Sequence, residues 1–206
     1  EERSLTPLGQ ELAAMPLDPR VARMIVAARA EGCLKEMLVI AAALTVQDPR
    51  ERPQEKQGTA DAAHKKFADE KSEFLSWLKL WQWYAGELEH KKSQRKLVQA
   101  CHENFLSALR MREWHDIHSQ LLGLANEHEW KENQLPANYD AIHRALLSGL
   151  LGNIGCKSED SGHYLGARGI KFLIHPGSAL NKKAGKWVAA AEITETTKLF
   201  ARCVAR

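Results

Sequence analysis

The stretch of sequence that decides the fold of residues 149–206 is IKFLIHPGSAL, residues 170–180. Its first half predicts a β-strand, because Ile170, Phe172 and Ile174 occupy alternate positions and are β-branched or aromatic, as strands favour. The Pro-Gly pair at 176–177 then ends the strand, since proline cannot donate a hydrogen bond to a sheet and glycine accepts turn conformations. A rigid strand therefore leads into an exposed turn.

That turn carries hydrogen-bond donors and positive charge. His175 and Ser178 supply an imidazole and a hydroxyl, and three lysines follow within eight residues of the serine: Lys182, Lys183 and Lys186. Hydroxyls and lysines at the end of a strand can hold a phosphate backbone. From this stretch alone, an ordinary loop with a solvated lysine cluster is the alternative.

The residues around this strand predict a small barrel. Eight of the 13 glycines in the chain lie between positions 149 and 185. They separate short β-type segments, which are Leu150–Cys156, His163–Leu165, Ile170–Ile174, Trp187–Ile193 and Lys198–Val204. Five short strands with a basic, glycine-cornered face fit an oligonucleotide-binding (OB) barrel over residues 149–206, which we expect to be truncated at its C-terminal end.

Residues 18–148 predict a helical bundle. Asp18 and the proline after it form a helix start, Gly32 forms a helix stop, and Asn138 can cap a later helix. Between these signals, apolar residues recur at helical spacing in six or seven segments. Residues 1–17, with a turn over 5–9, have too few apolar partners for a core and are expected to be a domain remnant. The fold class is therefore predicted to be α+β, a helical bundle followed by a small barrel.

Three of the six tryptophans fall in one predicted helix, at positions 77, 81 and 83. They could be mistaken for platforms on which nucleic-acid bases stack. Their helical spacing favours core packing instead, with Trp81 on the apolar side of the helix beside Leu78 and Leu88, and Trp77 flanking it.

The composition excludes several classes of protein. Hydrophobic residues make up 44% and charged residues 27% of the chain, which are ordinary globular values. No apolar run reaches the roughly 18 residues that span a bilayer, so we expect no membrane partner and a cytoplasmic location. Four widely spaced cysteines, at 33, 101, 156 and 203, indicate small buried residues in a reducing compartment. A zinc site built from them and some of the nine histidines is the disfavoured alternative.

Positive charge is concentrated at one end of the chain. Residues 141–206 contain ten Lys or Arg against four Asp or Glu, whereas the whole chain carries a net charge of only +3. A basic module beside a mildly acidic body favours a polyanionic partner, and nucleic acid is the most common one.

Six ordered motifs then resemble one family, the DEAH-box RNA helicases, and most closely their bacterial HrpA-type members. The motifs are Leu5-Thr6-x-Leu8-Gly9, Met15-Pro16-Leu17-Asp18-Pro19-Arg20, Gln47-Asp48-Pro49-Arg50-Glu51-Arg52-Pro53, Arg112-Glu113-Trp114 with Gln120-Leu121, Leu147-Ser148-Gly149-Leu150, and Ile174-His175-Pro176-x-Ser178, where x is any residue. The resemblance covers essentially the whole chain. It implies the tail of a winged-helix domain over 1–17, a helical ratchet domain over 18–148 and an OB barrel over 149–206.

The resemblance also implies a function. In this family the bundle packs over two motor domains and the barrel closes a channel for single-stranded RNA, so the implied partners are that RNA and the motor domains. No Gly-x-x-x-x-Gly-Lys-Ser/Thr phosphate loop and no Asp-Glu-Ala-His motif occurs in the chain. We therefore expect no catalytic residue and no cofactor here, with ATP and Mg²⁺ bound elsewhere in a full-length protein and the isolated chain inactive.

The implied RNA contacts lie in the barrel. The resemblance places them at the turn of residues 175–178 and around Thr196, Thr197 and Lys198. Adding the lysines after the turn gives the complete predicted RNA-binding set: His175, Ser178, Lys182, Lys183, Thr196, Thr197 and Lys198. Relatives often carry an arginine where this chain has His118, which puts a cationic RNA contact there in doubt near neutral pH.

Two other functions stay open at this point. The chain could be a protein-docking module that binds a helicase regulator or a ribosomal surface, in which case the bundle should expose an apolar patch. It could also be a hydrolase using Asp61 and His64, which are three residues apart in one predicted helix. That pair has no nucleophile nearby, so a surface hydrogen bond is the preferred interpretation.

Overall fold

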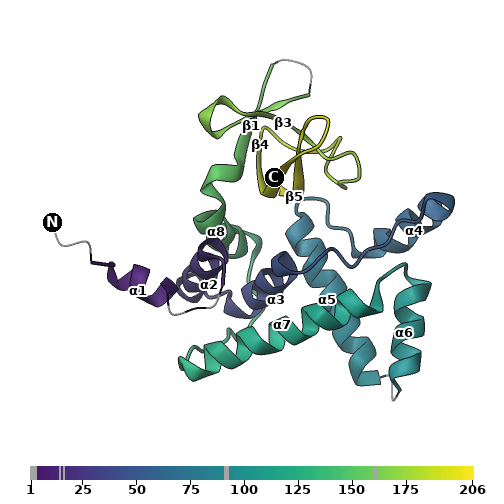
Figure 1. Cartoon of the computed structure of the whole chain (residues 1–206), viewed down its shortest axis with the longest axis horizontal. Helices are drawn as coiled ribbons and strands as arrows, with labels where there is room; N and C mark the ends of the chain where they lie inside the picture. Colours follow the sequence, from purple (N-terminus) through teal and green to yellow (C-terminus); the bar gives the residue numbers. More distant parts are fainter. Residues whose placement is uncertain (1–3, 14, 16, 91–92, 160–161) are drawn as a thin grey trace.

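The computed structural model describes residues 4–13, 15, 17–90, 93–159 and 162–206. Its α-helices lie between residues 7 and 150, and its strands lie between residues 154 and 205. Figure 1 shows the helices gathered in one bundle and the strands folded into a separate body that sits on it. This arrangement confirms the predicted fold class, a helical bundle followed by a small β-barrel.

Eight α-helices form the described part of the bundle. They are α1 (Pro7–Ala13), α2 (Pro19–Glu31), α3 (Leu34–Thr45), α4 (Gln57–His64), α5 (Glu73–His90), α6 (Gln94–Glu103), α7 (Ala108–Glu127) and α8 (Tyr139–Leu150). Short 3₁₀ helices follow or precede them at η1 (Gln54–Lys56), η2 (Lys65–Phe67) and η3 (Leu151–Asn153), and η4 (Ala167–Gly169) lies within the barrel.

The predicted helix ends are confirmed where capping chemistry specifies them. The carboxylate of Asp18 accepts a hydrogen bond from the backbone N–H of Arg20 at 2.8 Å, and Gly32 ends α2 with a left-handed φ of 65°. The Asn138 side chain accepts from the backbone N–H of Ala141 at 2.9 Å and begins α8.

Three local predictions are wrong. The turn expected over residues 5–9 is the start of α1, where the Thr6 hydroxyl accepts from the N–H of Gly9 at 3.0 Å. The helix expected from residue 104 begins only at Ala108, because Phe105 adopts a left-handed φ of 53° and Ser107 then caps α7. The first strand, expected from residue 150, begins at Ile154, because residues 139–150 continue as α8 and η3 follows.

The bundle core is built around α3, eight of whose 12 residues are buried. Trp114 of α7 is fully buried against it, and its indole N–H donates to the carbonyl of Val39 at 3.0 Å. On the other side, α8 approaches α2 so closely at Gly149 that a Cβ there would lie 2.4 Å from the carbonyl oxygen of Arg20. Gly149 therefore sets the spacing between these two helices.

The tryptophans of α5 pack against the bundle core, as predicted, and so does most of the expected apolar side, since Phe74 is buried and Leu75 and Leu78 pack against the core. Trp81 is half-buried, with its ring centroid 5.2 Å from that of Trp114 and 4.6 Å from that of His118. Leu80 and Tyr84 are buried, whereas Leu88 is 37% exposed. The buried side is wider than expected because α5 is apolar around much of its circumference, so periodicity alone does not fix how much of the helix packs inward.

The barrel consists of β1 (Ile154–Lys157), β2 (Tyr164–Gly166), β3 (Lys171–Ile174), β4 (Trp187–Glu195) and β5 (Leu199–Ala205). The strands close in the order β1-β2-β3-β5-β4, with only β3 and β5 parallel. The last strand pairs along both edges, with β3 and with β4. Eight buried residues fill the interior: Tyr164, Phe172, Ile174, Leu180, Val188, Ala190, Ala201 and Val204.

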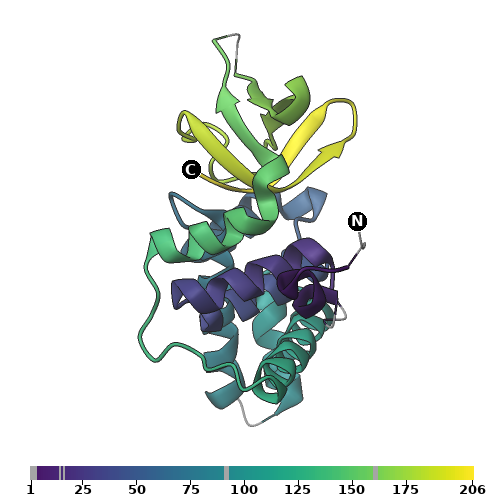
Figure 2. The same cartoon turned by 90° about the vertical axis from the view of Figure 1, so that its left-hand side faces the viewer.

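The barrel is fixed to the bundle at the start of α5, and Figure 2 shows α8 leading directly up into the strands. Glu73, which is 5% exposed, accepts two hydrogen bonds at 2.8 Å, from the hydroxyl of Ser178 and from the backbone N–H of Val204. Cys203 adopts a left-handed φ of 51°, and the next backbone N–H, that of Val204, donates to this carboxylate. The backbone N–H of Arg206 also donates to the carbonyl of Lys71 at 3.0 Å.

Candidate nucleic-acid interface

The predicted turn after β3 exists and is closed by its own hydrogen bonds. The backbone N–H of Gly177 donates to Nδ1 of His175 at 3.1 Å, and that of Ser178 donates to the carbonyl of residue 175 at 2.9 Å. The His175 ring meets Phe200 edge-on, with centroids 5.8 Å apart. Partial burial, followed by the charge of Arg202, lowers the pKa of His175. The imidazole is therefore neutral near neutral pH and supplies shape and polarity rather than positive charge.

Ser178 faces the bundle. Its hydroxyl donates to the carboxylate of Glu73 at 2.8 Å and accepts from the N–H of Leu180 at 3.2 Å. Ser178 was predicted to donate its hydroxyl proton to a phosphate. A hydroxyl has only one proton, and Ser178 donates it to Glu73 at the junction between the bundle and the barrel. An RNA contact by Ser178 would have to go through a lone pair and remains a prediction.

The loop after this turn is anchored by Leu180, which is fully buried in the barrel. It presents the predicted Lys182 and Lys183 to solvent and brings further cations beside them. The guanidinium of Arg206 donates to the carbonyl of Lys183 at 3.0 Å, and the N–H of Lys157 donates to the carbonyl of Lys186 at 2.7 Å. We call these five exposed residues the basic cluster: Lys157, Lys182, Lys183, Lys186 and Arg206.

The other predicted residues form the tip of the hairpin between β4 and β5. Glu195 pairs with Leu199, and within the tip the N–H of Thr196 donates to the carbonyl of Lys198 at 3.0 Å. Thr196, Thr197 and Lys198 are all exposed. Their hydroxyls and ammonium group suit contacts with phosphates and with ribose 2′-hydroxyls, which carry no sequence information.

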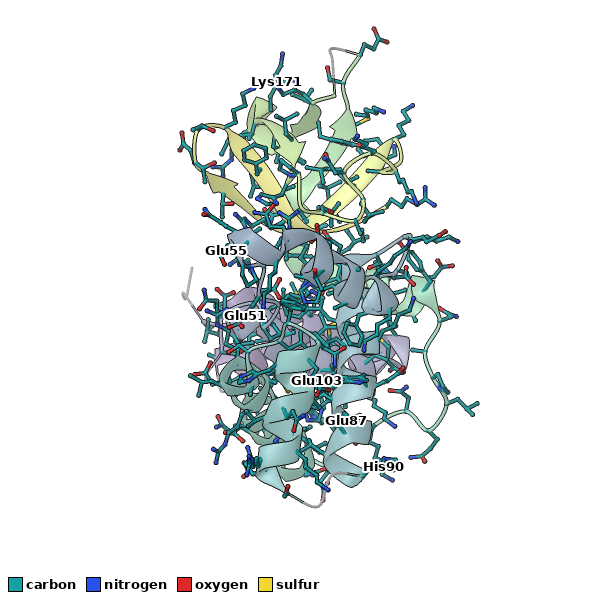
Figure 3. All side chains as sticks on the ribbon, turned by 90° about the vertical axis from the view of Figure 1, so that its right-hand side faces the viewer. Glu51, Glu55, Glu87, His90, Glu103 and Lys171 are labelled. Carbon is teal, nitrogen blue, oxygen red and sulfur yellow. The ribbon has the colours of Figure 1, made fainter. Side chains whose placement is uncertain are left out.

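The structure divides the predicted residues into two groups. Leu173 pairs with Phe200 in the parallel ladder, so extending the register places Lys198 level with Lys171 at the start of β3. His175 lies at the opposite end of the same strand, about 13 Å away at roughly 3.3 Å per residue. Figure 3 shows Lys171 at the end of the barrel that points away from the bundle. The hairpin tip therefore lies at the far end, whereas His175 and Ser178 lie at the bundle.

One exposed aromatic residue was missed. Trp187, the first residue of β4, is 59% exposed, while its neighbour Val188 is buried in the barrel. The sequence placed Trp187 in a strand without assigning it a face. The alternation of Val188 and Ala190 toward the interior was the signal that puts Trp187 on the outside.

The charged residues of the connection between α3 and α4 pair with one another. The guanidinium of Arg50 lies 2.6 Å from the carboxylate of Asp48, and that of Arg52 lies 2.7 Å from Asp61. Burial alone would raise the pKa of Asp48, but its hydrogen bonds and charge interaction with Arg50 outweigh burial and lower it. His64 contacts the carbonyl of Phe105 at 3.0 Å rather than Asp61. Asp61 and His64 thus have separate structural partners, and the geometry gives the hydrolase alternative no support.

His118 lies inside the aromatic cluster of the bundle. Burial, with a smaller contribution from the charge of His115, lowers the pKa of His118 to about 4. The ring is therefore neutral near neutral pH, in line with the doubt about a cationic RNA contact at this position.

The described residues hold no group of three or more His, Cys, Asp or Glu side chains that could bind a metal ion. Cys33 and Cys101 are buried thiols, and burial raises their pKa values to about 12 and about 11. Over the same described ranges, no helix combines the length and the apolar character needed to cross a membrane.

Comparison with known proteins agrees with this architecture. Residues 18–107 match the helicase associated domain (HA2), ratchet-like, and residues 142–206 match the oligonucleotide/oligosaccharide-binding (OB)-fold. The chain is 49% identical over 205 residues to an ATP-dependent RNA helicase HrpA homolog of Haemophilus influenzae and 46% identical over 202 residues to ATP-dependent RNA helicase HrpA of Escherichia coli. These alignments cover 100% and 98% of the chain. The chain therefore carries the HA2 and OB-fold domains that occur in HrpA-type RNA helicases.

The helicase relatives are much longer than this chain. It spans 16% of the length of the two bacterial relatives. It also aligns at 30% identity with the pre-mRNA-splicing factor ATP-dependent RNA helicase prp22 of Schizosaccharomyces pombe, with 99% of the chain covering 17% of that protein. The ratchet-like bundle and the OB barrel of an HrpA-type helicase are therefore the parts present here.

Proposed function

We propose that the chain is the accessory region of an ATP-dependent RNA helicase, in which the barrel binds single-stranded RNA and closes the RNA channel over the motor domains. The observation that carries this proposal is a closed barrel with OB strand order that exposes lysines at both ends, in the basic cluster and at the hairpin tip. The motor domains would supply ATP and Mg²⁺ binding, and the site of action would be the cytoplasm.

The chemistry of the exposed groups supports binding without sequence selection. Lys182, Lys183 and Lys198 offer charge to phosphates, and Thr197 offers a hydroxyl to a phosphate or a 2′-hydroxyl. A helicase must move along any sequence, and contacts of this kind do not depend on the identity of the bases.

The junction at Glu73 supports a role for the bundle in holding the barrel in a fixed orientation. A buried carboxylate that accepts hydrogen bonds from both the 175–178 turn and β5 holds the two parts in one orientation. We propose that the bundle packs over the motor domains and so holds the barrel where it closes the RNA channel.

The test is a salt titration of RNA binding by the 206-residue chain. If about four cations neutralise phosphates on a single strand, the slope of log affinity against log salt should be near −3, at roughly 0.7 per contact. Replacing Lys182 and Lys183 together by alanine should bring the slope to about −1.4 and weaken binding of all single-stranded sequences about equally. A slope near zero would contradict the proposal, as would RNA-stimulated ATPase activity of the purified chain at helicase-like rates.

Exposed leucines on the bundle favour a second candidate function, a protein-docking module for a regulator or a ribosomal surface. Leu109 is 67% exposed at the start of α7, and Leu135 is 80% exposed in the loop before α8. Binding through such groups would depend weakly on salt, so the same titration separates the two functions.

A further inference from the structure

A transverse row of residues crosses the outer wall of the barrel. In the ladder register, Trp187 of β4 pairs with Cys156 of β1, Cys156 pairs with Leu165 of β2, and Leu165 pairs with Lys171 of β3. Directly paired residues lie on the same face of a sheet. The residues next to them along the strands, such as Val188, point into the core, so this row faces outward.

The row is open to solvent and leads from the basic cluster toward the hairpin tip. Trp187 is 59% exposed and Leu165 is 47% exposed, and Lys171 is also exposed. At about 4.8 Å between neighbouring strands, the row is roughly 14 Å long. The next strand around the barrel is β5, and extending the register of the parallel β3–β5 ladder places Lys198 level with Lys171. The other end adjoins the basic cluster, since Trp187 directly follows Lys186 in sequence.

We propose that Trp187 is a base-stacking platform for single-stranded RNA, and that the strand crosses the outer wall along this row from the basic cluster to the hairpin tip. This inference rests on the proposed function and assigns a base contact to it. An exposed indole offers a flat face to any base, and the lysines and arginine of the basic cluster are placed to hold the flanking phosphates. Charge complementarity selects the occupant: five cationic residues beside one aromatic ring suit a polyanion that carries flat bases.

A mutation cycle with two probes tests this. The first probe is an oligouridylate of about 12 nucleotides, within the site sizes known for OB folds, and the second is an abasic ribose-phosphate chain of equal length. We expect Trp187→Ala to weaken oligouridylate binding about fivefold or more and to leave binding of the abasic chain unchanged, because stacking needs a base. Trp187→Phe should keep most of the affinity, since it retains an aromatic face.

Two controls make the result specific. Leu151, which is 69% exposed in η3 and lies outside the row, should be replaceable by alanine without a change in affinity for either probe. Tryptophan fluorescence of the wild-type chain should be quenched by oligouridylate and not by the abasic chain, and Trp187→Phe should remove most of that quenching. Melting temperatures of all variants should stay close to that of the wild-type chain, because both substituted side chains are exposed.

The outcomes separate this inference from the proposed function. If the wild-type chain binds both probes and Trp187→Ala changes neither affinity, the platform is overturned while RNA binding stands. An equal loss for both probes would also overturn stacking, because it would show a role that does not involve bases. If the wild-type chain binds neither probe, the proposed function fails and the platform fails with it.

Discussion

The bundle and the barrel use tryptophan in opposite ways. In the bundle, Trp114 is fully buried and Trp77 and Trp81 pack against it, with ring centroids 5.7 and 5.2 Å away. In the barrel, Trp187 stands on the outer wall and is 59% exposed. The difference follows from layering: helix faces in a bundle meet other helices, whereas among the residues that the structure describes no second layer covers the outer wall of the barrel at Trp187. An aromatic residue in such a position is therefore informative about binding.

The same contrast holds for charge. Arginines of the bundle pair with neighbouring carboxylates, as in Arg50 with Asp48 and Arg144 with Glu31. In the barrel, the lysines of the basic cluster gather beside one another. Paired charges on the bundle serve local geometry, while like charges held together raise the local potential for an anionic ligand.

The largest expected effect comes from exchanging the two kinds of tryptophan for alanine. Trp114→Ala should lower the free energy of unfolding by about 3–5 kcal/mol, because it leaves a cavity between α3 and α7 and removes the hydrogen bond to Val39. Trp187→Ala should change that free energy by less than about 0.5 kcal/mol. Denaturant titrations of both variants check this, and comparable losses would remove the contrast between the two regions.

The junction between the regions should give the next largest effect. Glu73→Ala removes the acceptor for the Ser178 hydroxyl and the Val204 N–H, and should destabilise the chain by about 2–3 kcal/mol. Ser178→Ala removes only one of these bonds and should have an effect of about 1 kcal/mol. Hydrogen exchange locates the loss, which we expect in β5 and the 175–178 turn before the bundle. Uniform loss of protection throughout the bundle would instead make Glu73 part of the bundle core.

Much of the fold was predictable because its signals are local. The caps at Asp18, Gly32 and Asn138 act over three or four residues, and each one is found where it was expected. The alternation of Phe172 and Ile174 similarly fixed the strand before the turn, and both residues are buried. Such signals need no knowledge of the partners across the fold.

The candidate site was less predictable because its geometry depends on distant partners. Ser178 was expected to face RNA, yet it donates to a residue 105 positions away in sequence. Trp187 and Leu165 become neighbours of one row only through the ladder register around the closed barrel. Composition and spacing give no access to that register, although they placed Lys182 and Lys183 in an exposed loop, while the residues of the hairpin tip came from the family resemblance.

The largest pH dependence should come from the bundle, because the pKa of His118 is lowered further than that of His175 in the barrel. Burial lowers the pKa of His118 to about 4, whereas the pKa of an imidazole in the unfolded chain is about 6.5. The stabilisation is therefore complete above about pH 6.5 and is lost as the pH falls toward 4. Because the ring is partly solvated, we expect a loss on the order of 1 kcal/mol.

His118→Gln should flatten this dependence, and replacement of the exposed His102 by glutamine should leave it unchanged. Denaturant titrations at several pH values give the comparison. If the free energy of unfolding depends on pH in the same way in the wild-type chain and in His118→Gln, another group is responsible. His143 is then the next candidate, because burial also lowers its pKa.

The smallest effect should come from single lysines, and it tests whether the two ends of the barrel share one strand of RNA. Lys198→Ala should make the salt slope shallower by roughly 0.7 when the probe has about 12 nucleotides, and exposed Lys131 of the bundle should be replaceable without effect.

The path from Trp187 to the level of Lys198 is about 19 Å, four steps between neighbouring strands. A probe of only two or three nucleotides is too short to reach both ends while it is stacked on Trp187. With that probe the slope should respond to replacement of Lys182 and Lys183 and no longer to Lys198→Ala. If the short probe still responds to Lys198→Ala, the hairpin tip binds RNA independently of the row.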